Sequence, residues 1–173
     1  MAFFRRELSP IERFESVLKD KLAARQKLAH RLGMVEAELE EKRAAAERLA
    51  QFDDRASMLA FRFWPGPLTL VLPLQPDAPV AKAVTAGLPT IALRCPAHPV
   101  MQAVLKQSGL FLAAPSANRS GGVSPTRAKH VERSFGDAMP LVLDAGPCAA
   151  GLESTIVAVR DFGWQLLRPG PVT

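Results

Sequence analysis

Cysteine is scarce in this sequence: Cys95 and Cys148 are the two cysteines, they lie far apart, and neither belongs to a C-x-x-C pair. Zinc-binding and thiol redox motifs therefore have no support, and buried free thiols are the simpler interpretation. Long apolar runs are also missing. No run reaches the roughly 18 residues that a membrane helix needs, and the chain starts without the apolar core of a signal peptide. We therefore expect a cytoplasmic protein with no membrane partner.

Internal repeats are absent, and the composition is that of a folded protein. The chain has 173 residues, of which 48% are hydrophobic, within the usual globular range. This length suits one domain with an appendage. The formal net charge of +5 favours polyanionic partners such as nucleotides or RNA, although many proteins with this charge bind nothing acidic.

Residues 1–50 have the composition of a helix, with Gly33 as their one glycine and Pro10 as their one proline. Ser9 can cap a helix that begins at Pro10, and apolar residues then recur every three or four positions. Gly33 either bends the helix into a hairpin or is tolerated within it. We expect residues 1–44 to form a helical extension, which packs on its own domain or mediates self-association as a partner-binding arm.

Residues 65–173 differ, because short β-rich runs alternate there with helical stretches between proline and glycine residues. The expected strands are Leu68 to Leu72, Thr90 to Leu93, Leu110 to Leu112, Leu141 to Leu143, Thr155 to Val159 and Trp164 to Leu167. The expected helices are Asp54 to Phe63, Ala78 to Ala86, Pro99 to Gln107 and Thr126 to Phe135. This alternation predicts an α/β domain with a mixed sheet.

The segment from Ala114 to Thr126 is the most informative, because it follows an expected strand and precedes an expected helix. Ligands bind outside the carboxyl ends of strands in open α/β sheets. Ser116 and Asn118 offer hydrogen-bond donors, the glycines allow close approach of a phosphate, and the helix that begins near Thr126 directs its positive end at the loop. Taken alone, such a segment is more often only a turn.

Three further segments place polar residues at strand ends. Arg94 follows the expected strand from Thr90, Ser154 precedes the strand at Thr155, and Arg168 follows the last expected strand. Together with the Phe63-Trp64-Pro65-Gly66-Pro67 turn, the order and spacing of these segments closely resemble the YrdC family of threonylcarbamoyl-AMP synthases. The resemblance covers residues 45–173, which we expect to form a partial YrdC-like domain.

The resemblance implies a fold, a reaction and a set of contacts. The fold is a twisted mixed sheet with flanking helices, incomplete here and preceded by a long N-terminal helix or helical hairpin. The reaction joins ATP, L-threonine and bicarbonate into threonylcarbamoyl-AMP and pyrophosphate, with Mg²⁺ accompanying ATP, for threonylcarbamoyladenosine modification of tRNA. The implied threonine or carbamate contacts are Arg94, Ser116 and Ser154. The implied nucleotide contacts are Thr90, Asn118, Thr126 and Arg168.

The sequence departs from the family in one large respect. The family's Lys-x-Arg motif, which holds triphosphate and threonine, occurs nowhere in these residues, and no tyrosine is present for its Tyr-containing loop. Losing a Lys-Arg pair and its loop costs on the order of 4–8 kcal/mol, or roughly three to six orders of magnitude in rate. We therefore expect weak or no turnover by this chain alone.

Several interpretations of the chain remain open at this stage. The first interpretation is a threonylcarbamoyl-AMP synthase or its remnant, and a fragment, a gene fusion or a mis-joined reading frame would each account for the missing motif. If it does not catalyse the reaction, the alternatives are a noncatalytic module that binds nucleotide or double-stranded RNA, and an interaction protein that acts through its helical arm. In each case, the strands that the family would supply leave an apolar sheet surface that something must cover.

Overall fold

A computed structural model describes residues 40–139 and 141–172, together with residues 23, 24, 26, 27, 29, 34 and 37, all seven of which are helical. The chain divides into two compact units, residues 1–42 and 43–173. The expected helix start at Ser9 and the expected bend at Gly33 lie outside the described residues. Within the described part, no helix is long and apolar enough to cross a membrane.

The second unit contains helices and strands in alternation, which confirms the expected α/β class. In chain order they are α2 (Asp54–Phe63), β1 (Leu68–Pro73), α3 (Lys82–Thr85), β2 (Thr90–Leu93), α4 (Pro99–Ser108), α5 (Ala128–Phe135), the 3₁₀ turn η1 (Gly136–Ala138), β3 (Thr155–Arg160) and β4 (Gly163–Arg168). Residues 40–47 add a helical segment before α2.

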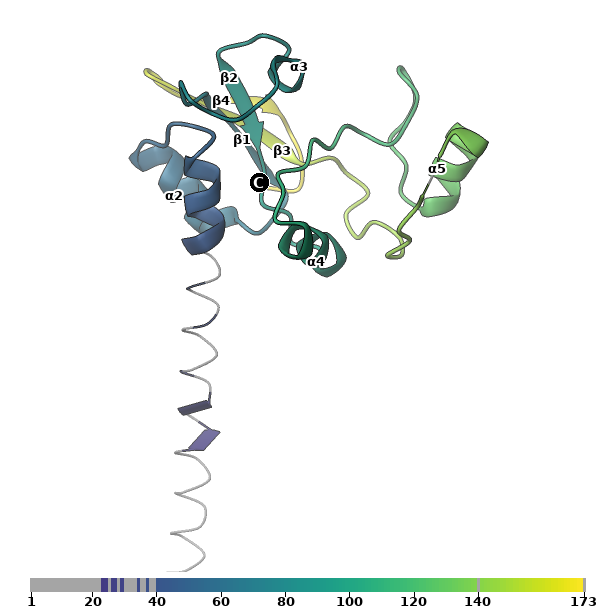
Figure 1. The fold of residues 1–173 in the computed structure, drawn as a ribbon, viewed down its shortest axis with the longest axis horizontal. Helices are drawn as coiled ribbons and strands as arrows, with labels where there is room; N and C mark the ends of the chain where they lie inside the picture. The colour runs from purple at the N-terminus through teal and green to yellow at the C-terminus, as the bar shows by residue number, and fades with distance from the viewer. Residues whose placement is uncertain are drawn as a thin grey trace, which may run out of the picture. The chain divides into compact units, whose positions relative to one another are not determined.

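The four strands form one mixed sheet in the order β2-β1-β3-β4 (Figure 1). Strand β1 pairs antiparallel with β2, with Leu70 opposite Leu93. It pairs parallel with β3, with Leu68 opposite Thr155. The β3–β4 pair is antiparallel, with Ile156 opposite Arg168. The parallel β1–β3 pair therefore lies at the centre of the sheet, between two antiparallel neighbours.

The core lies between β1 and α2. Leu68, Leu70 and Leu72 alternate along β1 and are fully buried, because successive side chains of a strand point to opposite faces. Ala56 and Leu59 of α2 are buried in the same cluster, and α2 lies beside this sheet (Figure 1). The small alanine side chain allows the helix to approach the leucines closely.

Helix α2 begins where the sequence places a capping aspartate. Asp53 has an extended backbone, and its Oδ1 accepts a hydrogen bond of 2.8 Å from the Ala56 amide. This bond, together with the neighbouring Arg55 guanidinium, holds the Asp53 pKa below its usual value. At the other end, Trp64 is buried, donates from Nε1 to the Leu68 carbonyl at 2.8 Å, and thereby fixes the turn into β1.

Two expected strands are wrong. Residues 110–112 and 141–143 have no regular secondary structure, and Leu110 and Leu141 are 63% and 71% exposed. Both runs have strand-forming residues, but a strand persists only where a neighbour satisfies its backbone groups. The expected helix from Ala78 to Ala86 is also shorter, since only Lys82–Thr85 is helical. Residues 78–81 lie between Pro76 and the helix without regular structure.

Candidate functional site

The sheet topology brings an end of each of the four strands to the same end of the sheet. Because β1 and β3 are parallel and their outer neighbours are antiparallel to them, the starts of β1 and β3 lie beside the ends of β2 and β4. Arg94 directly follows β2, Ser154 directly precedes β3, and Arg168 is the last residue of β4. Arg94 thus meets residues that lie 60 and 74 positions later in the sequence; we call this end of the sheet the arginine edge.

Arg168 forms hydrogen bonds to Ser154, directly before β3, through two of its guanidinium nitrogens. Its Nε donates to the Ser154 carbonyl at 3.0 Å and its Nη2 donates to the Ser154 hydroxyl at 3.0 Å. The Ser154 hydroxyl also pairs with the Thr69 hydroxyl of β1 at 2.8 Å. Ser154 is buried, so these bonds satisfy a polar group that water cannot reach easily.

Glu153 supplies the negative charge of the arginine edge. Its carboxylate accepts a hydrogen bond from Arg168 Nη1 and another from the Ser124 hydroxyl. The Ser124 bond and then the Arg168 and Arg94 charges hold the Glu153 pKa below its usual value, against an opposing effect of partial burial. Arg94 itself donates from Nε to the Gly66 carbonyl at 3.0 Å.

Gly170 allows the chain after β4 to pass close to the start of β3. A Cβ atom at this position would lie 2.4 Å from the Thr155 nitrogen and 2.5 Å from the Glu153 carbonyl oxygen. Both are backbone atoms, so neither can rotate away as a side chain would. Only glycine fits here, and the close approach keeps Arg168 against residues 153–155.

The loop that contains Asn118 is bonded mainly to itself. Asn118 Nδ2 donates to the carbonyls of Arg119 and Gly122 at 2.9 Å each, and Arg119 Nε donates to the Ser134 carbonyl at 2.7 Å. Asn118 Oδ1 is buried and has no hydrogen-bond partner among the described residues. A buried acceptor without a partner is uncommon and calls for an explanation. One explanation is that Oδ1 accepts a hydrogen bond from a bound ligand.

The other site residues expected from the sequence lie in different places. Thr90 starts β2 and pairs with Pro73, so it lies at the opposite end of the strand from Arg94. Ser116 is exposed in the loop. Thr126 accepts a backbone hydrogen bond from Cys148 at 2.9 Å and lies two residues after Ser124. Of the seven expected residues, Arg94, Ser154 and Arg168 share the arginine edge.

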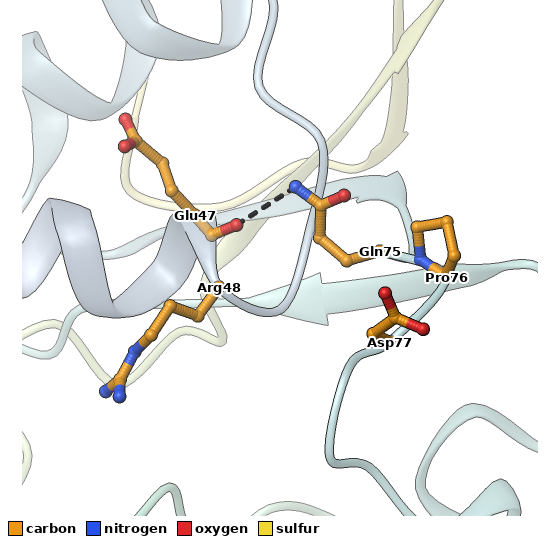
Figure 2. Close-up of a pocket in the computed structure, with 5 residues that line it drawn as sticks. All are labelled: Glu47, Arg48, Gln75, Pro76 and Asp77. Carbon is orange, nitrogen blue, oxygen red and sulfur yellow. Dashed lines mark hydrogen bonds between the residues drawn. The ribbon is translucent and has the colours of Figure 1, made fainter.

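A shallow pocket lies elsewhere, and no expected site residue lines it. Its walls are Glu47, Arg48, Gln75, Pro76 and Asp77, as Figure 2 shows. Gln75 crosses it with a hydrogen bond of 3.1 Å from Nε2 to the Glu47 carbonyl. The pocket is thus the seam where residues 47–50 meet the turn after β1. Its mixed charges do not indicate an anion site.

Sequence reasoning missed Glu153, Ser124 and Thr69 as members of the arginine edge. Glu153 had a readable signal, because it is an acid directly beside the candidate Ser154 at a strand entrance. Ser124 and Thr69 had none, since their roles depend on which strands are neighbours. No group of three or more His, Cys, Asp or Glu side chains that could hold a metal ion occurs among the described residues.

The fold and this edge define an α/β domain that gathers arginine and hydroxyl side chains at one end of a mixed sheet. The Sua5/YciO/YrdC family model, described as "Telomere recombination", matches residues 21–170. The chain is 48% identical over 120 residues to the threonylcarbamoyl-AMP synthase of Bacillus subtilis, covering 69% of this chain and 34% of that protein. The corresponding Pyrococcus abyssi protein is 44% identical over 120 residues, covering 69% and 35%.

Solved structures agree with these matches. Pyrococcus abyssi Sua5 complexed with L-threonine superposes with a TM-score of 0.70 at 44% identity, over 73% of this chain and 37% of that one. Escherichia coli YciO superposes with a TM-score of 0.65 at 20% identity, over 73% and 61%, and supports the fold alone. The chain belongs to the Sua5/YciO/YrdC family. It spans about a third of the length of the curated relatives named above.

Proposed function

We propose that this chain is the nucleotide- and threonine-binding part of a threonylcarbamoyl-AMP synthase of tRNA modification. The observation that carries the proposal is the arginine edge, where Arg94, Ser154 and Arg168 meet in a family whose relatives bear that name. Arginine forks bind carboxylate and phosphate oxygens in parallel hydrogen bonds. Threonine, bicarbonate and ATP all carry such oxygens.

The proposed reaction needs positioning and charge stabilisation more than a side-chain nucleophile. The threonine amine condenses with bicarbonate to a carbamate, with loss of water. A carbamate oxygen then forms a bond to the α-phosphorus of ATP as the bond to pyrophosphate breaks, which gives threonylcarbamoyl-AMP. Arginines that face the developing negative charge lower the barrier for such a step, and a fixed geometry removes much of its entropic cost.

Magnesium belongs to the proposal as part of the ATP complex. Mg²⁺ keeps several waters and is commonly held by substrate phosphates with one or two carboxylates. Glu153 is the one acid that we place at the arginine edge, and it is already bonded to Arg168 and Ser124. An ion held mainly by the phosphates of ATP fits this donor set better than a dedicated protein cage.

Turnover by this chain alone is expected to be weak, because the Lys-x-Arg motif of the family does not occur in its sequence. Binding is therefore the property to measure. Direct binding of tRNA or double-stranded RNA remains a weaker proposal, favoured by the net charge of +5 alone. The proposed role implies a cytoplasmic protein, where ATP and tRNA are available.

ATP is expected to raise the melting temperature of the chain. A ligand at ten times its Kd stabilises a protein by about 1.4 kcal/mol, which is about 3–6 °C for a domain of this size. Differential scanning fluorimetry with millimolar Mg-ATP, and separately with L-threonine, measures the shift. Adenosine is the matched control without phosphates and should give a smaller shift. Unchanged melting with ATP at millimolar concentration would contradict the proposal.

Asn118→Ala is expected to weaken ATP binding about five- to tenfold, the value of one neutral hydrogen bond of about 1–1.4 kcal/mol. The substitution removes the buried Oδ1 acceptor and the two bonds that shape its loop. Titration calorimetry measures the Kd. Ser120→Ala on the same loop is the control and should bind ATP like the unchanged chain. Equal Kd values for both variants would show that Asn118 does not contribute to ATP binding.

A further inference from the structure

Glu153 links the loop before α5 to the end of β4. One carboxylate oxygen accepts from the Ser124 hydroxyl, which lies in the loop before α5, and the other accepts from Arg168 Nη1 at the end of β4. The loop that carries Asn118 is therefore tied to the arginine edge at Ser124. Arg168 is held between Glu153 and Ser154, so its guanidinium has one preferred orientation.

The donor count of Arg168 shows what this orientation leaves available. A guanidinium has five N–H donors. Three of them bind the Ser154 carbonyl, the Ser154 hydroxyl and the Glu153 carboxylate. Two N–H groups remain for a ligand, one on each terminal nitrogen, and the planar fork fixes their directions. Without Glu153, Arg168 would lose the hydrogen bond that fixes the position of its Nη1 atom.

We propose that Glu153 is a positioning residue of the arginine edge, which aims the remaining Arg168 donors at an anionic ligand and anchors the Asn118 loop through Ser124. The proposal deepens the proposed function and rests on it for the identity of the ligand, a nucleoside triphosphate. Glu153 acts through Arg168 and Ser124 and need not touch the ligand itself.

A purely stabilising role does not account for this pair. The Arg168 and Glu153 side chains are 37% and 39% exposed, and ion pairs with this much exposure contribute little to folding. A purely electrostatic role predicts the opposite effect on binding. An acid beside Arg94 and Arg168 lowers the local positive potential, so its removal would tighten the binding of an anion if the orientation of Arg168 did not matter.

The protonation state of Glu153 gives a readout that needs no ligand. Its pKa is lowered by the Ser124 hydroxyl, then by Arg168 of β4 and by Arg94 after β2. A carboxyl whose pKa is lower when folded contributes its full stabilisation above the unfolded value of 4.5 and loses it as the pH falls through the folded value. The Ser124 link should therefore persist at pH 4.5 and weaken only as the pH falls further, through the lowered pKa of Glu153 in the folded protein.

The test compares Glu153→Ala with Glu153→Gln in the full chain, with Glu132→Gln on α5 as the matched control. Titration calorimetry with Mg-ATP should give a Kd about tenfold higher for Glu153→Ala and about two- to threefold higher for Glu153→Gln, because glutamine keeps an acceptor but loses the charge-assisted bonds. Glu132→Gln should change the Kd less than twofold. Equal or tighter ATP binding by Glu153→Ala would overturn the proposal.

Amide hydrogen exchange of the chain without ATP separates this proposal from the proposed function. Exchange at residues 122–126 should rise at least severalfold in Glu153→Ala and in Ser124→Ala. In the unchanged chain, after correction for intrinsic rates, it should rise as the pH falls through the lowered pKa of Glu153. Unchanged protection in both variants would refute the anchoring role. If no variant and no unchanged chain binds ATP, the proposed function fails while the exchange result still decides whether Glu153 holds the loop.

Discussion

Leu70→Ala is expected to lower the free energy of unfolding by about 2–5 kcal/mol, the usual cost of removing a buried leucine side chain. Leu70 has no exposed surface, lies at the centre of β1, and packs in the cluster that includes Leu59 of α2. Net stabilities of domains are only about 5–15 kcal/mol. This one substitution should therefore remove a large share of the stability of the second unit.

Urea unfolding followed by tryptophan fluorescence measures this loss, because Trp64 is buried beside the same cluster. Leu166→Ala is the matched control: Leu166 lies on β4 and is 59% exposed, so its loss should cost less than about 0.5 kcal/mol. Equal losses for both variants would show that β4 is covered in solution, and that the core is not confined to the side of α2.

The strands that the sequence predicted correctly are those bounded by strong local signals. Strand β1 follows the Trp64–Pro67 turn, and β3 and β4 flank the turn at Asp161 and Phe162. Helix α2 has both a capping Asp53 and the stop at Pro65. In each case, the signal lies in the residues at the ends of the element itself, so periodicity and turn signals suffice.

The errors fall where the outcome depends on a distant neighbour. Residues 110–112 and 141–143 are as apolar as the true strands. Neither run forms a strand, however, and Leu112 and Leu143 are 44% and 61% exposed. Hydrophobic pattern alone cannot say whether a pairing strand is present.

Three members of the arginine edge were predictable from the sequence, but their connections and the other members were not. Arg94, Ser154 and Arg168 stand out because each lies at or directly beside the end of a strand. Thr90 and Arg94 lie at opposite ends of β2, and which of the two joins Ser154 and Arg168 depends on strand direction, which periodicity does not encode. The antiparallel pairing of β2 with β1 places Arg94 there. Glu153 was missed because its importance arises from Ser124 and Arg168, 29 and 15 residues away.

Arg168→Ala is expected to weaken Mg-ATP binding on the order of 10²–10⁴-fold, because two charge-assisted hydrogen bonds of about 1.5–3 kcal/mol each are lost. The folding cost should be far smaller. The Arg168–Glu153 pair is more than a third exposed on both sides, so urea unfolding should show a loss of only about 1–2 kcal/mol. Titration calorimetry and urea unfolding on one preparation separate the two effects.

Arg168→Lys and Arg160→Ala decide whether the fork or the charge is responsible. Lysine keeps the charge but has no planar fork, so Arg168→Lys should still bind ATP at least tenfold more weakly than the unchanged chain if two directed donors are worth about 1.4 kcal/mol or more. Arg160 ends β3 at the opposite end of the sheet, and Arg160→Ala removes the same charge there. Equal weakening of ATP binding by Arg160→Ala and Arg168→Ala would mean that net charge alone attracts ATP. The arginine edge would then not be the binding site.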